Sequence, residues 1–196
     1  YWNCDSTIDD EIYCKYDAHT INLVGFILKH ERSGSLFSYF MSKLWATSTQ
    51  VAIDMNAEGV RALDIVIALT DDGYEKYEDV IKATFSFINM IRKEGIPEHV
   101  VNDFRRITGI QFRFMQKQDE LSFVFEKSSG LHEYAVRDIL TGSLLLSSPD
   151  EKLYKKLIDA LVPENMIAIL SSSHEDHVSK TPWIEEWYGV EYDVVK

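Results

Sequence analysis

Residues 62–73 read ALDIVIALTDDG and join a strand pattern to a helix start. Large apolar residues occupy every second position from Leu63 to Leu69, which predicts a strand over residues 62–70 with one buried face. Thr70 then offers an N-cap oxygen, and the two aspartates that follow it suit the positive end of a helix dipole. The stretch therefore predicts a strand that leads directly into a helix.

Helical periodicity continues downstream of this junction. We expect long helices near residues 74–93 and 98–117, separated by Gly95, with Pro97 in the first turn of the second one. Residues 120–140 look helical but broken near residues 128–130. The run Ser148-Pro149-Asp150-Glu151 resembles a capping box with proline at the first helical position, and Pro163 ends the helix that it predicts. Residues 166–171 are expected to form a final strand.

Upstream, residues 18–29 predict a buried helix, and a second helix follows the polar break at residues 30–34. Residues 51–55 are a candidate strand, and residues 12–14 a short one. The strands at 51–55 and 62–70 are close in sequence, so a hairpin with antiparallel pairing is the natural connection. We expect an α+β domain over residues 1–172, with an antiparallel sheet and long helices packed on one face, followed by a polar tail or linker at residues 173–196. Because residue 1 is not Met, we expect the N-terminus to be a cut inside a longer chain.

Composition excludes several classes of partner. Thirty-two acidic residues against 20 Lys and Arg give a net charge of −12, which disfavours nucleic acid and anionic membranes. No apolar run approaches the roughly 20 residues that a transmembrane helix needs. The two cysteines, Cys4 and Cys14, are too few for a disulfide framework and are interpreted as small buried or half-buried side chains. The compartment is not readable from the N-terminus, and a soluble, intracellular protein is favoured.

The residues form no recognisable catalytic motif. His30-Glu31 begins an H-E-x-x-H zinc motif, but position 34 is glycine. The inverted form H-x-x-E-H, a G-x-S-x-G turn and glycine-rich phosphate loops are all absent from the sequence. We interpret His174 and His177 as solvated tail residues, and the arginines at 105, 106 and 113 as part of an exposed helix face or an ion pair. We therefore assign no catalytic residue, metal ligand or cofactor to this chain, and expect it to bind no stoichiometric zinc.

A family resemblance appears in residues 25–36, GFILKHERSGSL, which are similar to the L-I-G-H-E-G-P-G-S-L run of the insulinase/pitrilysin family of zinc metallopeptidases. Further matches follow in the same order as in that family. They are residues 38–46 (SYFMSKLWA), 69–73 (LTDDG), 112–114 (FRF), 140–145 (LTGSLL), 161–166 (LVPENM) and 186–192 (EWYGVEY). Their collinearity covers nearly the whole chain.

The resemblance is to the second of the family's four homologous domains, which have the LuxS/MPP-like metallopeptidase fold. It implies a non-catalytic domain that encloses a substrate chamber together with a first domain, and that first domain holds the zinc. The parent would then be a zinc metalloendopeptidase that degrades peptides, while this chain alone is predicted inactive. Its implied partners are a peptide substrate and neighbouring domains of the same polypeptide. The alternative is a structural or assembly module of a catalytically inactive relative.

The family's second domain also carries an exosite for the N-terminal end of a peptide. The matching positions are Gly25, Glu31 and the strand segment Thr49-Gln50-Val51. A carboxylate can pair with an α-ammonium group, and a free strand edge can add a peptide strand by main-chain hydrogen bonds.

This chain departs from the family pattern around that site. Arg32 and Ser33 replace a glycine and a proline, Lys29 replaces a glycine, and Val51 and Ala52 replace two glycines on the strand. Side chains on the strand would narrow a groove. Glu31 has an alternative role as the ion-pair partner of a neighbouring cation or as a cap for the following helix.

Overall fold

A long antiparallel hairpin lies at the centre of the computed structural model, which describes residues 19–55, 61–132, 134–172 and 183–194. Strand β1 (Ala46–Met55) pairs with β2 (Arg61–Leu69) in a register that places Val51 opposite Ile65. The predicted hairpin is therefore confirmed, and β1 begins earlier than the sequence pattern suggested. The short strand expected at residues 12–14 lies outside the described residues.

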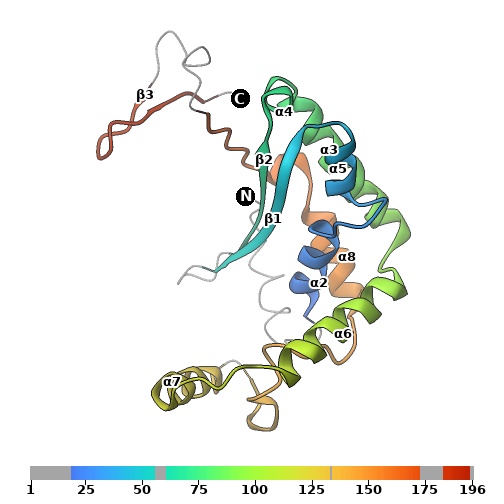
Figure 1. Ribbon diagram of the computed structural model, residues 1–196, viewed down its shortest axis with the longest axis vertical. Helices are drawn as coiled ribbons and strands as arrows, with labels where there is room; N and C mark the ends of the chain where they lie inside the picture. Colours follow the sequence, from blue (N-terminus) through green and yellow to red (C-terminus); the bar gives the residue numbers. More distant parts are fainter. Residues whose placement is uncertain (1–18, 56–60, 133, 173–182, 195–196) are drawn as a thin grey trace.

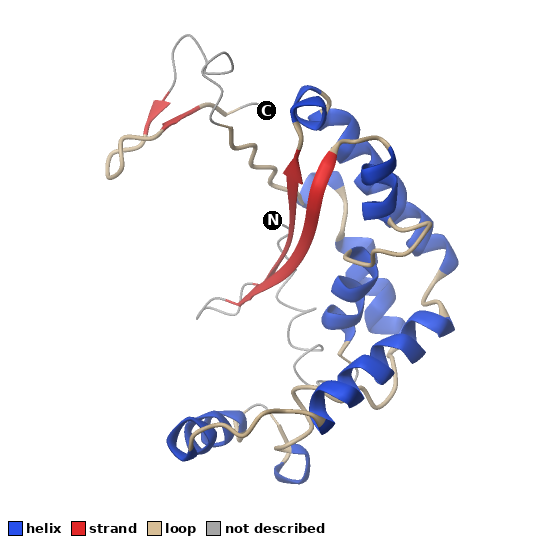
Figure 2. Ribbon diagram, in the orientation of Figure 1, coloured by secondary structure: helices blue, strands red, loops and turns tan. Residues whose placement is uncertain are grey.

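The two faces of the hairpin have different environments. The face that carries Leu63, Ile65 and Ile67 packs against the apolar core, as the alternation of the sequence predicts. On the opposite face Val66 is 56% exposed. Four helices lie on one side of the hairpin, and no described helix covers the other side (Figure 1; Figure 2). They are α2 (Thr20–Leu28), α3 (Leu36–Ser42), α5 (Tyr77–Glu94) and α8 (Glu151–Ala160).

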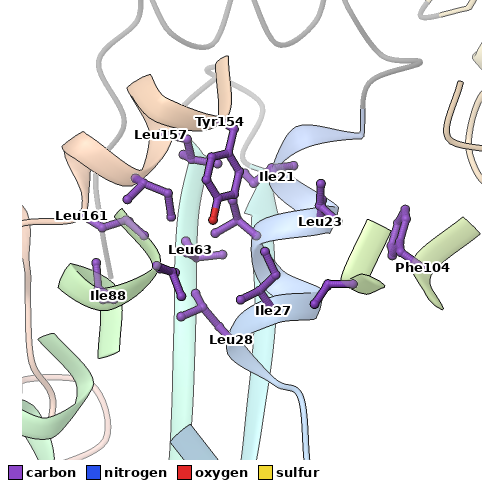
Figure 3. Packing of buried hydrophobic residues seen from close by; sticks show 14 of the residues in the cluster. Ile21, Leu23, Ile27, Leu28, Leu63, Ile88, Phe104, Tyr154, Leu157 and Leu161 are labelled. Carbon is purple, nitrogen blue, oxygen red and sulfur yellow. The ribbon is translucent and has the colours of Figure 1, made fainter. Parts of the chain in front are cut away.

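Helix α2 (Thr20–Leu28) is the central helix of the main core. It is apolar on nearly all sides because it contacts β1, α6 (Glu98–Arg113) and α8 (Glu151–Ala160) at once. Figure 3 shows side chains from these helices and from β2 pointing toward one another. The fully buried members of this cluster include Leu23, Val24, Leu28, Leu63, Ile88, Leu157, Ile158 and Leu161.

A second core cluster lies beside the first, at the other end of the hairpin. Helix α3 (Leu36–Ser42) and helix α5 (Tyr77–Glu94) contribute Leu36, Phe40 and Val80 to it. Phe87 packs against both clusters, so the two cores are continuous. The short helix α4 (Asp71–Glu75) begins at the predicted N-cap, where the Thr70 hydroxyl oxygen accepts a hydrogen bond from the Gly73 backbone N–H at 3.1 Å.

Helix α7 (Glu120–Gly130) differs from the other helices because none of its residues is buried. It lies at the end of the molecule farthest from the top of the hairpin in Figure 1. The sequence predicted a break at residues 128–130, and α7 does end there, before a short 3-10 turn η2 (Val136–Asp138). Helix α6 ends at Arg113, a few residues before the predicted limit.

Two expectations for the C-terminal part are wrong. The cap of α8 is Asp150, whose carboxylate accepts from the backbone N–H groups of Lys152 and Leu153, so Pro149 precedes the cap instead of occupying the first helical turn. The strand expected at 166–171 is absent: after the 3-10 turn η3 (Pro163–Asn165), Met166 makes an isolated bridge and residues 167–172 have no regular structure. Ile167 and Ile169 are exposed, so no burial holds them in a sheet.

The last described segment forms a small hairpin. Strands β3 (Trp183–Ile184) and β4 (Glu191–Tyr192) pair antiparallel, in a region that the sequence treated as a polar tail or linker. The described part of the chain is thus a mixture of helices and small antiparallel sheets. None of the helices described here has both the length and the apolar composition that a membrane crossing requires.

Candidate functional site

The loop between α2 and α3 carries Glu31 and is fixed at two points. The His30 Nδ1 atom accepts a hydrogen bond from the Arg32 backbone N–H at 3.1 Å, and the His30 ring stacks edge-on against Phe26 of α2. The Arg32 guanidinium donates to the Asp103 carboxylate of α6 at 3.3 Å. The loop is therefore tied to two helices.

Glu31 is exposed and makes no hydrogen bond or ion pair with any described residue. The alternative roles expected for it are not realised. Arg32 pairs with Asp103, and helix α3 is capped by Ser35, whose hydroxyl accepts from the Ser38 backbone N–H. Lys29 is also exposed and forms no ion pair within the described ranges. Within the described part of the chain, the carboxylate of Glu31 thus has no partner that a ligand would have to displace.

Strand β1 has a free edge within the described part of the chain. It pairs with β2 on one side, and no described strand pairs with it on the other. Gln50 is exposed and Thr49 is half-buried, with a buried hydroxyl oxygen that has no hydrogen-bond partner. Free main-chain groups along such an edge can pair with an additional extended strand.

Gly25 and Val51 lie together on the inner side of this strand. A β-carbon placed on Gly25 would be 3.5 Å from the Cγ1 atom of Val51, and Val51 packs against the main core. The Val51 side chain therefore points toward α2, away from the open face. The sequence predicted that side chains at Val51 and Ala52 would narrow a peptide groove beside the strand. On the outer face Val51 does not narrow it, because its side chain points inward, and Ala52 contributes only a methyl group.

The open face of the hairpin carries a carboxylate that the sequence analysis did not single out. Asp64 lies opposite Ala52 in the register, and Gln50 lies opposite Val66, so these four residues share one face. One carboxylate oxygen of Asp64, Oδ1, is buried and has no hydrogen-bond partner. The sequence shows that Asp64 is an acid at an outward position of an apolar strand. It does not show which residues lie beside Asp64, because that depends on the register between the two strands.

The structure therefore unites some of the predicted site residues and separates others. It joins Gly25 to Val51 through contact, and it places Thr49 and Gln50 on the same strand. No hydrogen bond or ion pair links Glu31 to these described residues. Among the arginines of α6, Arg105 donates to the Ser147 carbonyl oxygen at 3.0 Å, while Arg106 and Arg113 are exposed.

The described residues contain no group of three or more His, Cys, Asp or Glu side chains that could hold a metal ion. His174, His177, Cys4 and Cys14 lie outside the ranges that the structure describes.

Comparison with protein-family models gives two matches that together cover nearly all of the chain. Residues 1–108 match the model described as the peptidase M16 inactive domain. The chain belongs to the peptidase M16 family. A second model of this M16 family, described as its middle or third domain, matches residues 112–196, so the two matches adjoin within α6.

Individual M16 relatives agree with this assignment. Human insulin-degrading enzyme is 32% identical over 178 residues, which cover 90% of this chain and 17% of that protein. Human nardilysin is 25% identical over 185 residues, covering 91% of this chain and 16% of its own length. The insulin-degrading enzyme of Drosophila melanogaster is 27% identical over 183 residues. The chain thus spans less than one fifth of the length of these curated relatives.

A solved structure of an M16 relative has the same fold. The crystal structure of pitrilysin superposes with a TM-score of 0.71, at 21% sequence identity, over 77% of this chain and 16% of that chain. The predicted membership of the insulinase/pitrilysin family is confirmed.

Proposed function

We propose that this chain is a non-catalytic, substrate-binding part of the chamber of an insulinase-like zinc metalloendopeptidase that degrades peptides. The observation that carries the proposal is the free edge of β1 on a hairpin whose other face has no described helix. Family membership supports it, because the matched model for residues 1–108 is the one described as inactive. In this proposal the zinc is held by the first domain of the parent enzyme, and this chain supplies no ligand to it.

A peptide would bind by adding a strand to β1. Main-chain hydrogen bonds along residues 49–51 supply affinity with little sequence preference, which suits an enzyme that accepts many peptides. Most of the inner side of β1 is already occupied by the core through Val51, so side chains of the added strand have free space mainly on the outer face.

Glu31 would receive the α-ammonium group of the peptide. Its carboxylate is exposed and unpaired within the described residues, and the loop that carries it is anchored by the contact between Arg32 and Asp103. A charge-assisted hydrogen bond to a carboxylate is stronger than a neutral one, so the terminal ammonium group would set the register of the bound strand.

The larger architecture belongs to the same proposal. Residues 1–172 would form one domain of the LuxS/MPP-like type, and residues 173–196 would lead toward the next domain of a soluble, intracellular parent. The separate position of the β3–β4 hairpin, away from the helices in Figure 1, supports this division.

A second candidate function is that of an assembly module in a catalytically inactive relative. It is consistent with α7, whose large apolar side chains Leu121, Val124 and Phe125 are all more than half exposed. Such a surface suits contact with a neighbouring domain of the same polypeptide. Both candidates predict this contact, and they differ in whether the parent cleaves peptides.

The test uses the full-length protein and two versions of one peptide, with a free and with an acetylated N-terminus. Glu31→Gln should raise KM for the free-amine peptide about tenfold, because it removes one charge-assisted contact, and should leave the acetylated peptide unchanged. Glu94→Gln is the matched control, since Glu94 is an exposed acid and the last residue of α5.

The outcomes separate the two candidates. A selective effect of Glu31→Gln supports the substrate-binding function. Equal effects on both peptides would exclude Glu31 as the ammonium site. A full-length protein that cleaves neither peptide, with or without added zinc, would favour the assembly module.

A further inference from the structure

The segment that leads into α8 runs beside α6 and carries an exposed serine (Figure 1). Residues 145–150 have no regular secondary structure, and Ser148 among them is exposed. Its hydroxyl forms no hydrogen bond with any described residue. The sequence pattern suggested that Ser148 caps α8, but the cap is Asp150, so capping does not account for the serine.

The residue after Ser148 is Pro149, which restricts the backbone of the serine. A proline ring disfavours the helical conformation of the preceding residue and keeps that residue extended. An exposed, extended serine followed by proline is the form of substrate that proline-directed protein kinases accept. The segment thus presents a hydroxyl group that suits such an enzyme.

A guanidinium group lies beside this segment. Arg105 of α6 is exposed, and its Nη2 atom donates a hydrogen bond to the Ser147 carbonyl oxygen at 3.0 Å. That carbonyl belongs to the peptide bond between Ser147 and Ser148, so its oxygen lies within a few covalent bonds of the Ser148 hydroxyl. Asp103, the nearest acid before Arg105 on α6, pairs with Arg32 instead. The other donors of Arg105 contact no described residue.

We propose that Ser148 is a phosphorylation site, and that Arg105 binds the phosphate and ties the start of α8 to α6. A proline-directed kinase supplies a nucleoside triphosphate as the phosphate donor. The Ser148 oxygen forms a bond to the γ-phosphorus, and the bond from that phosphorus to the β–γ bridging oxygen breaks. The hydroxyl proton passes to a base of the kinase, and the nucleoside diphosphate leaves. This inference does not depend on the function proposed above.

The charges around Ser148 determine where the phosphate goes. A phosphoserine carries about −1.5 to −2 charge at pH 7 and three strong acceptor oxygens. Asp150 and Glu151 follow closely in the sequence, and the Asp150 carboxylate already accepts from the first backbone N–H groups of α8. The helix start therefore repels the phosphate. A guanidinium, whose planar fork matches phosphate oxygens, is the favourable contact on the side of α6.

The contact would act on the segment and not on the helices. Both α6 and α8 pack against α2, so each is already held in place by the core. A phosphate bound to Arg105 therefore has to move neither helix. Its effect is to immobilise residues 145–150 between them.

The first experiment tests the modification on the full-length protein, with a proline-directed kinase and ATP. Peptide mass spectrometry locates the phosphate, and Ser148→Ala confirms the position. Ser143→Ala is the control, because Ser143 is a nearby exposed serine that no proline follows. We expect phosphate on Ser148 in wild type and in Ser143→Ala, and none on this segment in Ser148→Ala.

Hydrogen exchange then tests the role of Arg105. In wild type, phosphorylation should slow the exchange of the backbone amides of residues 145–148 about three- to tenfold, as expected of one solvent-exposed, charge-assisted contact. Arg105→Gln should remove this slowing, because the phosphate then meets only the repulsion of Asp150 and Glu151. Arg106→Gln should keep it, since Arg106 is an exposed arginine of α6 without a described contact. Thermal unfolding checks that each unmodified variant is folded.

The possible results decide the inference. Slower exchange in phosphorylated wild type and Arg106→Gln, together with its loss in Arg105→Gln, establishes both the site and its receptor. Absence of phosphate on Ser148 in the folded full-length protein would overturn the inference. It is equally wrong if phosphorylation leaves the exchange of wild type unchanged, or slows it alike with and without the Arg105 guanidinium.

Discussion

The α-carbon of Gly73 lies directly against the main chain of Trp45. A β-carbon built on Gly73 would be 1.9 Å from the Trp45 carbonyl oxygen and 2.7 Å from its carbonyl carbon. The same oxygen accepts a hydrogen bond from the Thr70 backbone N–H at 3.0 Å. The residue just before β1 is thus fixed to the residues that leave β2, and this contact closes the top of the hairpin that carries the proposed site.

The first prediction is that Gly73→Ala destabilises the protein. The added methyl group meets backbone atoms that cannot rotate away, so we expect a loss of about 1–3 kcal/mol in the free energy of unfolding. Gly109→Ala provides the control, because a β-carbon there meets no atom within 4 Å and lies inside α6. It should stabilise by about 0.5–1 kcal/mol. Chemical denaturation measures both, and equal effects of the two substitutions would show that the Trp45 contact is absent in solution.

The sequence predicted this junction well because its signals are local. The alternation from Leu63 to Leu69 reflects one buried face, and Thr70 caps the helix that follows, as observed. The start of β1 was missed because Thr47, Ser48, Thr49 and Gln50 have no apolar alternation. Their strand conformation comes from pairing with β2, which is a tertiary effect.

The failures of the sequence analysis depended on contacts between distant residues. The apolar run at residues 166–170 resembled a strand, but in the structure Ile167 and Ile169 are exposed, and an apolar run alone does not form a strand. At the candidate site, two features follow from the register of β1 with β2, which the sequence pattern does not determine. They are the direction of the Val51 side chain and the position of Asp64 opposite Ala52.

The second prediction concerns Arg92, which joins α5 to the end of α8. Its Nη2 atom donates to the carbonyl oxygens of Ile158 and Leu161 at 2.9 and 3.2 Å, and its Nε atom pairs with Asp159 at 3.3 Å. Arg92→Lys should cost about 1–3 kcal/mol, because an ammonium group cannot reproduce this fork. Asp159→Asn, which removes only a surface ion pair, should cost less than about 1 kcal/mol. Urea denaturation measures the free energy of unfolding of both variants. If Arg92→Lys and Asp159→Asn lowered it equally, the contacts of Arg92 with the two carbonyl oxygens would contribute nothing to stability.

The last prediction is a loss of stability at high pH that depends on Tyr154 of α8. Burial raises the pKa of Tyr154 to about 12, compared with about 10 for an unfolded tyrosine. Between these values the unfolded chain releases the proton while the folded chain keeps it, so folding stability falls as pH rises, by at most about 1.4 kcal/mol per pH unit from this group. Tyr154→Phe should flatten the curve of unfolding free energy against pH between about pH 10 and 12, whereas Tyr39→Phe, at an exposed tyrosine, should keep the wild-type slope. Equal slopes for wild type and Tyr154→Phe would mean that this hydroxyl is accessible to water in the folded protein.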